Sequence, residues 1–227
     1  MPSLDIIIPI FNEKKNLFNV VKKISTEVKF KKNFIICYDS KNETGLKYLK
    51  NFKNIKKVKN LGHGPNEAIL SGIKNSKSEL ILVYMADDYE NINLINYMVG
   101  LTKKYDLIIP SRYVKGGVFE NAKWYKKYIA IFGFVLINKI AGIPFKDSTN
   151  AFKLFKRSIL KKINLKSKIG FTYALELTIK SYFSRYKIIE IPCVWRDLQG
   201  RKSNFKIIKW IPHYLYWFFY ALIKKNF

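Results

Sequence analysis

The first half of the chain alternates short, continuously apolar runs with longer segments of mixed polarity. The apolar runs lie at residues 4–10, 34–38, 55–58, 79–85 and 107–110, and they are typical of strands. The segments between them are typical of helices, and the one after Asn12 places Leu17, Val20, Val21, Ile24 and Val28 on one face. This alternation predicts a mostly parallel sheet flanked by helices, in which ligands bind at the carboxyl ends of the strands.

Carboxylates follow three of these expected strands. Glu13 follows the first, Asp39 ends the second, and Asp87 and Asp88 end the fourth. Because the carboxyl ends of parallel strands meet at one edge of a sheet, we expect these acids to gather there. Paired carboxylates hold divalent cations, and such a cation binds a diphosphate. The alternatives are a solvated acidic turn at Asp87–Asp88 and, for Glu13, a carboxylate favoured by a helix N-terminus.

The second half is more basic and aromatic. A loop at 111–117 contains Arg112 and Lys115 and ends in two glycines, and a helix is expected over 122–140. A second helix is expected over 171–183, and a strand over 188–195, where Pro192 indicates a sheet edge or a bulge.

Composition limits the class of protein. With 227 residues and 48% hydrophobic content, the chain can form one sizeable globular core. Cys37 and Cys193 lie in apolar runs without metal-binding spacing, so we expect buried thiols in a reducing compartment. The first residues lack the basic region of a secretory signal peptide, and none is expected.

The net charge of +26 indicates an anionic partner: nucleic acid, anionic lipid or a phosphorylated substrate. A basic nucleic-acid-binding protein is therefore one hypothesis. It does not explain acids at three successive strand ends, and the sequence contains no helix-turn-helix, zinc-finger or RNP-like motif. We expect no nucleic-acid partner.

Residues 206–227 predict an amphipathic helix. Apolar residues recur at helical spacing from Ile207 to Ile223, interleaved with Trp and Tyr and flanked by lysines. Lys209, Pro212 and His213 interrupt the run, whereas a membrane-spanning helix needs about 20 consecutive apolar residues. We expect a helix that lies in the bilayer interface, attracted to anionic lipid. Packing on the core of the domain is the alternative.

Four segments together carry a resemblance: Ile8–Glu13, Ser111–Tyr113, Asp147–Lys153 and Glu190–Ser203. They resemble, in order and spacing, the P-x-Y-N-E, G-S-R-Y, D-x-T-S-G-F-R and E-x-P-x-x-F-x-x-R-x-x-G-x-S-K motifs of family 2 glycosyltransferases with the GT-A fold. The similarity is to the dolichyl- or polyprenyl-phosphate sugar synthase type. Ala86-Asp87-Asp88 stands where that family has D-x-D, and Asp39-Ser40 where it has D-D-G-S.

The resemblance implies an inverting, metal-dependent enzyme that moves a sugar from a UDP- or GDP-sugar to a polyprenyl or dolichyl phosphate. It implies a catalytic domain over 1–205 and a membrane-interface helix over 206–227, on the cytoplasmic face of the membrane. The alternatives are transfer to a sugar hydroxyl in surface polysaccharide synthesis, with Asp147 as the base, and an inactive scaffold that binds nucleotide sugars.

The resemblance also implies roles for individual residues. They are nucleotide-sugar binding by Pro9, Phe11, Glu13, Asp39, Gly62 and Asp87; Mg²⁺ or Mn²⁺ binding by Asp88 and Asp87; acceptor-phosphate binding by Arg112, Lys115, Arg201, Lys202 and Ser203; and catalysis by Asp88, Arg112 and Asp147.

Overall fold

The computed structural model describes residues 2–13, 15–40, 43–121, 128–129, 132–196 and 207–226. The elements in chain order are β1 (Leu4–Ile10), α1 (Lys15–Glu27), β2 (Lys32–Tyr38), the 3₁₀ helix η1 (Thr44–Leu49), β3 (Ile55–Lys59), α2 (Pro65–Asn75), β4 (Leu80–Val83), α3 (Leu94–Leu101), β5 (Leu107–Ser111), β6 (Val118–Glu120), the π-helix η2 (Val135–Ile140), β7 (Lys153–Lys156), the 3₁₀ helix η3 (Arg157–Lys161), α5 (Thr172–Phe183), β8 (Ile188–Pro192), β9 (Val194–Arg196) and α6 (Ile207–Lys225).

Seven strands form one sheet in the order β3-β2-β1-β4-β7-β5-β8. Strands β1, β2, β3 and β4 pair in parallel, as do β5 and β8, whereas β7 is antiparallel to both of its neighbours. A separate parallel pair, β6 and β9, extends beyond the sheet. The prediction of a mostly parallel sheet flanked by helices, a GT-A-like α/β fold, is confirmed.

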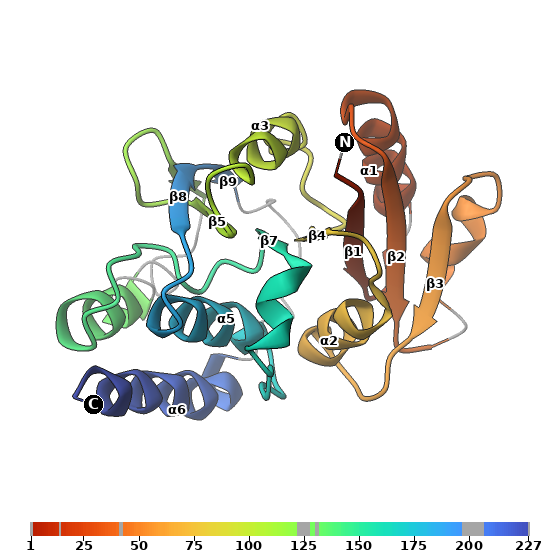
Figure 1. The fold of residues 1–227 in the computed structure, drawn as a ribbon. Coiled ribbons are helices and arrows are strands. Elements are labelled where there is room, and N and C mark those ends of the chain that lie inside the picture. The colour runs from red at the N-terminus through yellow and green to blue at the C-terminus, as the bar shows by residue number, and fades with distance from the viewer. Residues whose placement is uncertain are drawn as a thin grey trace.

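Helices cover both faces of the sheet (Figure 1). On one face, α1 and α3 bury residues such as Leu17, Ile24 and Met98 against β1 and β4. On the other face, α2 and α5 bury residues such as Ile69 and Leu177. The strands between these layers are apolar on both faces, which explains their continuous hydrophobic runs.

Two local predictions differ from the structure. Between β2 and β3, where the sequence pattern predicts a helix, the structure has the short 3₁₀ helix η1, which ends at Leu49. It packs so closely against the turn between β1 and α1 that a Cβ on Gly45 would lie 2.1 Å from the Glu13 carbonyl oxygen. Pro192 ends β8, which is the edge strand, so the strand expected over 188–195 is two strands. Much of the helix expected over 122–140 lies outside the described residues.

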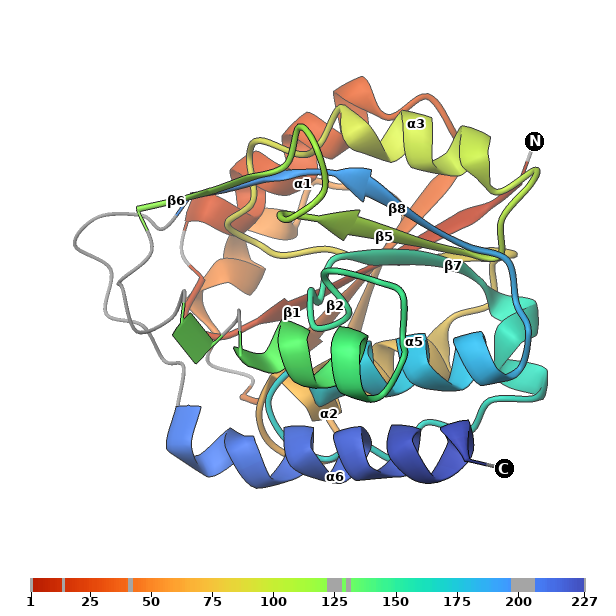
Figure 2. The ribbon, with the colours of Figure 1, turned by 90° about the vertical axis from the view of Figure 1, so that its left-hand side faces the viewer.

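Helix α6 forms an outer layer beneath α5 in both views (Figures 1 and 2). It buries Trp217, Phe218 and Ala221 in a cluster with η2 and α5. Its outer face leaves Phe219 and Ile223 more than half exposed. The helix therefore packs on the domain with one side only. Within the described ranges, no helix is both long and apolar enough to cross a bilayer.

Asp5 lies near the amino end of β1, away from the carboxyl ends of the strands, and its side chain binds several neighbouring segments. The residue is 3% exposed, and its carboxylate accepts hydrogen bonds from Ser76, the Lys77 N–H, Ser78 and Asn33 at 2.6–3.0 Å. Burial alone would raise the pKa of Asp5, but these donors outweigh burial and lower the pKa to about 2.

Candidate functional site

The residues expected to bind a nucleotide sugar lie around the carboxyl ends of β1 and β2. Glu13 is 8% exposed, whereas the Phe11 ring is 55% exposed and Pro9 is half-buried. Between them Asn12 has a left-handed φ of 56° and donates its backbone N–H to Glu43 at 2.8 Å. The turn after β1 is thus fixed by a carboxylate from η1, and it presents an aromatic ring to solvent.

Asp39, at the end of β2, is tied to the glycine loop before α2. It accepts hydrogen bonds from the Asn60 amide and from the Gly64 N–H, the latter at 3.1 Å. Gly64 has a φ of +88°, which favours glycine, and it directly precedes Pro65, the first residue of α2. The loop that contains Gly62 is therefore a fixed turn against Asp39.

Asp88 follows β4, and its carboxylate organises the loop it belongs to. Oδ1 accepts the N–H groups of Glu90 and Asn91 at 3.1 Å and the Asn91 amide at 3.0 Å, while Oδ2 accepts the Asn91 amide at 2.8 Å. Burial raises the pKa of Asp88, and these hydrogen bonds offset part of the rise. Asp87 is half-buried beside it, and Ala86 is 3% exposed in the core.

Asp87 and Asp88 are the residues that could hold a divalent cation. A carboxylate offers about four lone-pair sites. Of the four hydrogen bonds that the Asp88 carboxylate accepts, three go to Oδ1 and one goes to Oδ2, so Oδ2 is the oxygen better able to bind a cation. A partly desolvated carboxylate is a chemically suitable ligand for a hard cation. The described residues contain no group of three or more His, Cys, Asp or Glu that could enclose a metal ion.

Arg112 and Asp147 form a bidentate ion pair at the carboxyl end of β5. The Arg112 Nε and a terminal guanidinium nitrogen each lie 2.7 Å from a different Asp147 oxygen, and the Arg112 N–H donates at 3.0 Å. Glu190 on β8 accepts the N–H groups of Lys146 and Asp147, which fixes the Asp147 backbone. The Asp147 side chain is fully buried, and the Arg112 side chain is 16% exposed.

The Arg112 guanidinium also lies over two aromatic rings, 5.2 Å from the centroid of Tyr113 and 5.0 Å from that of Phe119. Burial would lower the pKa of Arg112, but the Asp147 carboxylate outweighs it and raises the pKa. Lys115 is exposed on the same loop. Arg201, Lys202 and Ser203 lie outside the described residues.

Lys153 was not predicted as a site residue, although the charges of Asp147 and Arg112 act on it. Its side chain is fully buried on β7, and its Nζ has no hydrogen-bond partner among the described residues. Burial lowers the pKa of Lys153 to about 7, against the opposing influence of Asp147 and Glu190. Its position in an apolar-looking strand gave no sign that its charge would interact with Asp147 and Glu190.

Two further interactions missed in the sequence join the acidic loop to β9. The Asn91 side chain bonds both backbone groups of Val194, at 2.7 and 3.0 Å. Arg196 pairs with Glu90 and with Glu120, its Nε lying 2.7 Å from the Glu120 carboxylate. The loop after β4 is thus anchored to a strand about 100 residues later, a relation that local sequence patterns do not reveal.

The family model for glycosyl transferase family 2 matches residues 5–164. The chain is 28% identical over 227 residues to a dolichol-phosphate mannosyltransferase of Pyrococcus furiosus, covering 92% of this chain and 62% of that protein. It is 25% identical over 117 residues to a polyprenol monophosphomannose synthase of Mycolicibacterium smegmatis, covering 46% and 44%. The chain thus spans less than two thirds of the length of these relatives.

Among solved structures, the chain resembles glucosyl-3-phosphoglycerate synthase from Mycobacterium tuberculosis in complex with Mn²⁺, UDP and glucosyl-3-phosphoglycerate. The TM-score is 0.70 at 12% identity, over 99% of this chain and 80% of that one. A second complex of that synthase, with Mn²⁺, UDP-glucose and phosphoglyceric acid, gives 0.70 at 13% identity, over 99% and 79%. These likenesses concern the fold. Because the family model matches more than half of its residues, the chain belongs to glycosyl transferase family 2.

Proposed function

We propose that this glycosyltransferase moves a sugar from a UDP- or GDP-sugar to a polyprenyl or dolichyl phosphate, with inversion at the anomeric carbon. The observation that carries the proposal is the arrangement of one carboxylate loop and one partly buried arginine at the same end of the sheet. The relatives whose names include dolichol phosphate or polyprenol support the choice of acceptor.

On the donor side, Phe11 and Pro9 would contact the base, while Asp39 and Glu13 would accept hydrogen bonds from the nucleoside. The exposed Phe11 ring and the fixed turn around it support this role. Gly62 belongs to the loop held by Asp39 and would lie beside the nucleotide. Mg²⁺ or Mn²⁺ held by Asp87 and Asp88 would neutralise the diphosphate as it leaves.

On the acceptor side, Arg112 is the best-placed described cation for a phosphate. Its guanidinium is held in one orientation by Asp147 and by the Tyr113 and Phe119 rings, and its side chain is 16% exposed. Arginine presents its donors in a planar fork that suits phosphate oxygens. We assign Lys115, Arg201, Lys202 and Ser203 to the same acceptor-phosphate group.

The transfer step needs no strong base with this acceptor. The second pKa of a phosphate monoester is about 6, so an acceptor oxygen is already anionic at neutral pH. That oxygen forms the new bond to the anomeric carbon, and the bond from this carbon to the diphosphate breaks, with its electron pair leaving on the nucleoside diphosphate. A sugar hydroxyl would need a base, whereas both Asp147 oxygens already bind Arg112. Asp147 is better suited to positioning Arg112.

A lipid acceptor requires the protein to reach a membrane surface. The exposed Phe219 and Ile223 on α6 and the net charge of +26 support attachment through this helix. We accordingly propose a catalytic domain over 1–205 that is held at the cytoplasmic face by residues 206–227. Transfer to a lipid carrier would serve the synthesis of cell-wall or surface polysaccharides.

The direct test is a donor panel. Purified protein is incubated with polyprenyl phosphate, Mg²⁺ or Mn²⁺ and, in turn, labelled UDP- and GDP-sugars, and label that partitions into organic solvent is counted. At least one donor should give lipid-linked label with the wild-type protein and almost none with Asp88→Ala. Label that appears only in water-soluble glycan would overturn the lipid acceptor, and transfer by Asp88→Ala at the wild-type rate would overturn the metal assignment.

A further inference from the structure

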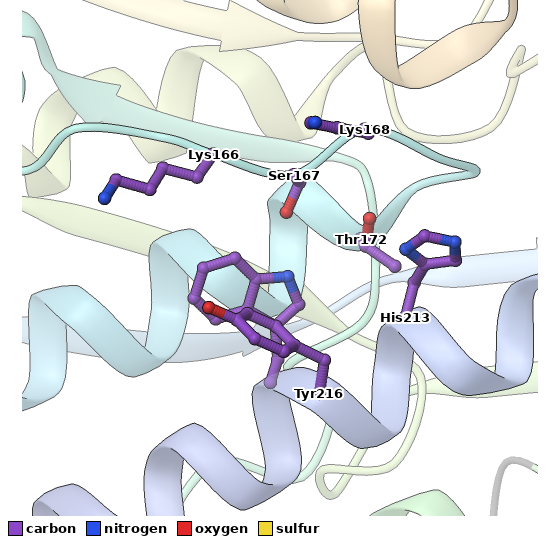
Figure 3. A pocket seen from close by; sticks show the side chains of 7 residues that line it. Lys166, Ser167, Lys168, Thr172, His213 and Tyr216 are labelled. Atoms are coloured by element: carbon purple, nitrogen blue, oxygen red, sulfur yellow. The ribbon is translucent and has the colours of Figure 1, made fainter.

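A second, separate pocket lies between α6 and the loop that precedes α5 (Figure 3). Its volume is about 240 Å³. The loop contributes residues 166–168, α5 contributes Thr172, and α6 contributes His213, Tyr216 and Trp217. None of these residues belongs to the site at the sheet edge.

The loop is held rigidly by a buried carboxylate. Glu176 on α5 is fully buried and accepts the N–H groups of Lys166 and Ser167, each at 2.7 Å. Its charge is paired with Lys180 at 2.5 Å. Asn66, on α2, donates to the Ser167 carbonyl oxygen at 2.7 Å. The backbone of Ser167 is therefore fixed on both sides, and the pocket has a preformed wall.

The Ser167 hydroxyl is the unexplained group in this wall. The residue is 4% exposed, and its Oγ has no hydrogen-bond partner among the described residues. Figure 3 shows this hydroxyl directed from the loop into the space between Thr172 and Tyr216. Buried hydroxyl groups normally have a partner, so a ligand that supplies an acceptor here would satisfy Ser167.

Two exposed lysines that flank Ser167 in the loop favour an anionic ligand. Lys166 and Lys168 are exposed on both sides of Ser167, and His213 lies opposite on α6. The pocket also lies at the N-terminus of the 12-residue helix α5, whose dipole favours negative charge. The Thr172 and Ala174 N–H groups already bond Ile169 and Phe171, so the helix offers its dipole and not free donors. The described residues that line the pocket include no carboxylate.

We propose that this pocket binds the phosphate of an anionic lipid headgroup, apart from the reacting substrates. The group that binds is a phosphate mono- or diester, and a soluble phosphate compound would offer the same group. The lipid source is favoured because the same helix exposes Ile211, Phe219 and Ile223, which are 40%, 56% and 59% exposed. A headgroup bound beside such a face would keep α6 in the bilayer interface.

The main experiment compares two double variants with equal charge changes. Lys166→Gln/Lys168→Gln removes the pocket lysines, and Lys161→Gln/Lys162→Gln removes two exposed lysines that do not line it. Sedimentation is measured with phosphatidylcholine vesicles, with and without phosphatidylglycerol. We expect the pocket variant to lose about tenfold more affinity for the anionic vesicles than the control. Equal losses would show that only general charge matters and would overturn the proposal.

Two further arms identify the ligand. Ser167→Ala, which changes no charge, should weaken binding to the anionic vesicles about threefold, and no change would contradict a role for the hydroxyl. Glycerol 3-phosphate and inorganic phosphate are titrated into the wild-type protein by calorimetry. Binding that depends on Lys166 and Lys168 would overturn the lipid source in favour of a soluble phosphate, and no binding supports the lipid.

The proposal is separable from the transfer reaction. With polyprenyl phosphate dispersed in detergent, the Lys166→Gln/Lys168→Gln variant should keep the wild-type transfer rate, because no membrane is needed. A comparable loss of transfer in detergent would place the pocket in the acceptor site and contradict a separate role. If the wild-type protein showed no transfer with any donor, the proposed function would fail while the vesicle comparison would still decide the pocket.

Discussion

The Asp147 carboxylate binds the Arg112 guanidinium through both oxygens, at 2.7 Å each, and also accepts the Arg112 backbone N–H. Among the described residues, Arg112 is the only arginine at the end of β5. Its pair with Asp147 holds the guanidinium donors in one orientation. The arginine is useful for a phosphate only while that orientation is kept, because a misplaced group loses much of its catalytic effect.

Asp147→Asn should therefore lower the transfer rate without unfolding the protein. The amide keeps one acceptor but no charge, and we expect kcat/KM for the lipid phosphate to fall about 100-fold. Steady-state kinetics with varied acceptor would show this as a raised KM together with a lower kcat. Asp106→Asn, which removes a carboxylate from the partly exposed pair with Lys156, is the control and should change little. Equal effects of the two variants would contradict the positioning role.

Arg112→Lys separates charge from geometry. Lysine keeps the positive charge but cannot form the two parallel bonds to Asp147 or stack on Tyr113 and Phe119. We expect at least a tenfold loss in kcat/KM for the lipid phosphate and little change in the KM for the nucleotide sugar. A parallel loss for both substrates would show that Arg112 acts on the donor.

Buried Lys153 should make stability depend on pH. Its pKa in the folded protein is about 7, below its ordinary value of 10.5, so between these values the unfolded chain binds a proton that the folded protein lacks. Stability should rise with pH across this window by about 1.4 kcal/mol per unit, and this contribution should be flat below about pH 7. Urea unfolding from pH 6 to 9 should show the slope in the wild type and lose it in Lys153→Met. Parallel curves for the two proteins would contradict this account.

Asp5 should give the same sign of pH dependence as Lys153, but in the acid range. Its pKa of about 2 in the folded protein lies below the ordinary 3.8, so its contribution is present above about pH 4 and is lost as the pH falls through about 2. Asp5→Asn should destabilise the protein at pH 7 by about 2 kcal/mol, the free-energy equivalent of that shift. Exposed Glu79→Gln, at the same end of the sheet, is the matched control. A change below about 0.5 kcal/mol in Asp5→Asn would show that its hydrogen bonds contribute little.

The outer face of α6 should decide membrane attachment. Phe219 and Ile223 are 56% and 59% exposed, so Phe219→Ser/Ile223→Ser should fold normally. Burial of each side chain in lipid contributes about 1.5 kcal/mol or more, so vesicle binding should weaken more than tenfold. Tyr97→Ser on α3, where Tyr97 is 57% exposed, is the control and should bind as the wild type does. Unchanged vesicle binding by the α6 variant would show that this face does not enter the bilayer.

The strand ends could be predicted because they depend on local pattern and on one general rule. Continuous apolar runs marked β1, β2 and β4, and parallel pairing brings the carboxyl ends of these neighbouring strands together. The sequence therefore predicts that Glu13, Asp39 and Asp88 lie at one edge of the sheet. The pairing of Arg112 with Asp147 was not predicted, because 35 residues separate them and the antiparallel insertion of β7 brings them together.

The remaining differences have similar causes. Lys153 is the first residue of β7, and only the sheet order shows that this strand lies between β4 and β5, where the Lys153 side chain is fully buried. Asn91 gave no signal, because its partner Val194 is 103 residues away. For α6 the sequence left two interpretations open. The structure shows that Trp217 packs on the domain, while Phe219 faces outward, and attachment to a membrane stays a prediction.

One measurement tests the central claim most directly: transfer of labelled sugar by the purified protein to polyprenyl phosphate, with polyprenol lacking the phosphate as the paired acceptor. Label extractable into organic solvent should form with the phosphate alone, disappear when EDTA removes divalent cations, and return when Mn²⁺ or Mg²⁺ is restored in excess. Equal labelling of the two lipids, or labelling that persists in EDTA, would contradict a metal-dependent transfer to a lipid phosphate.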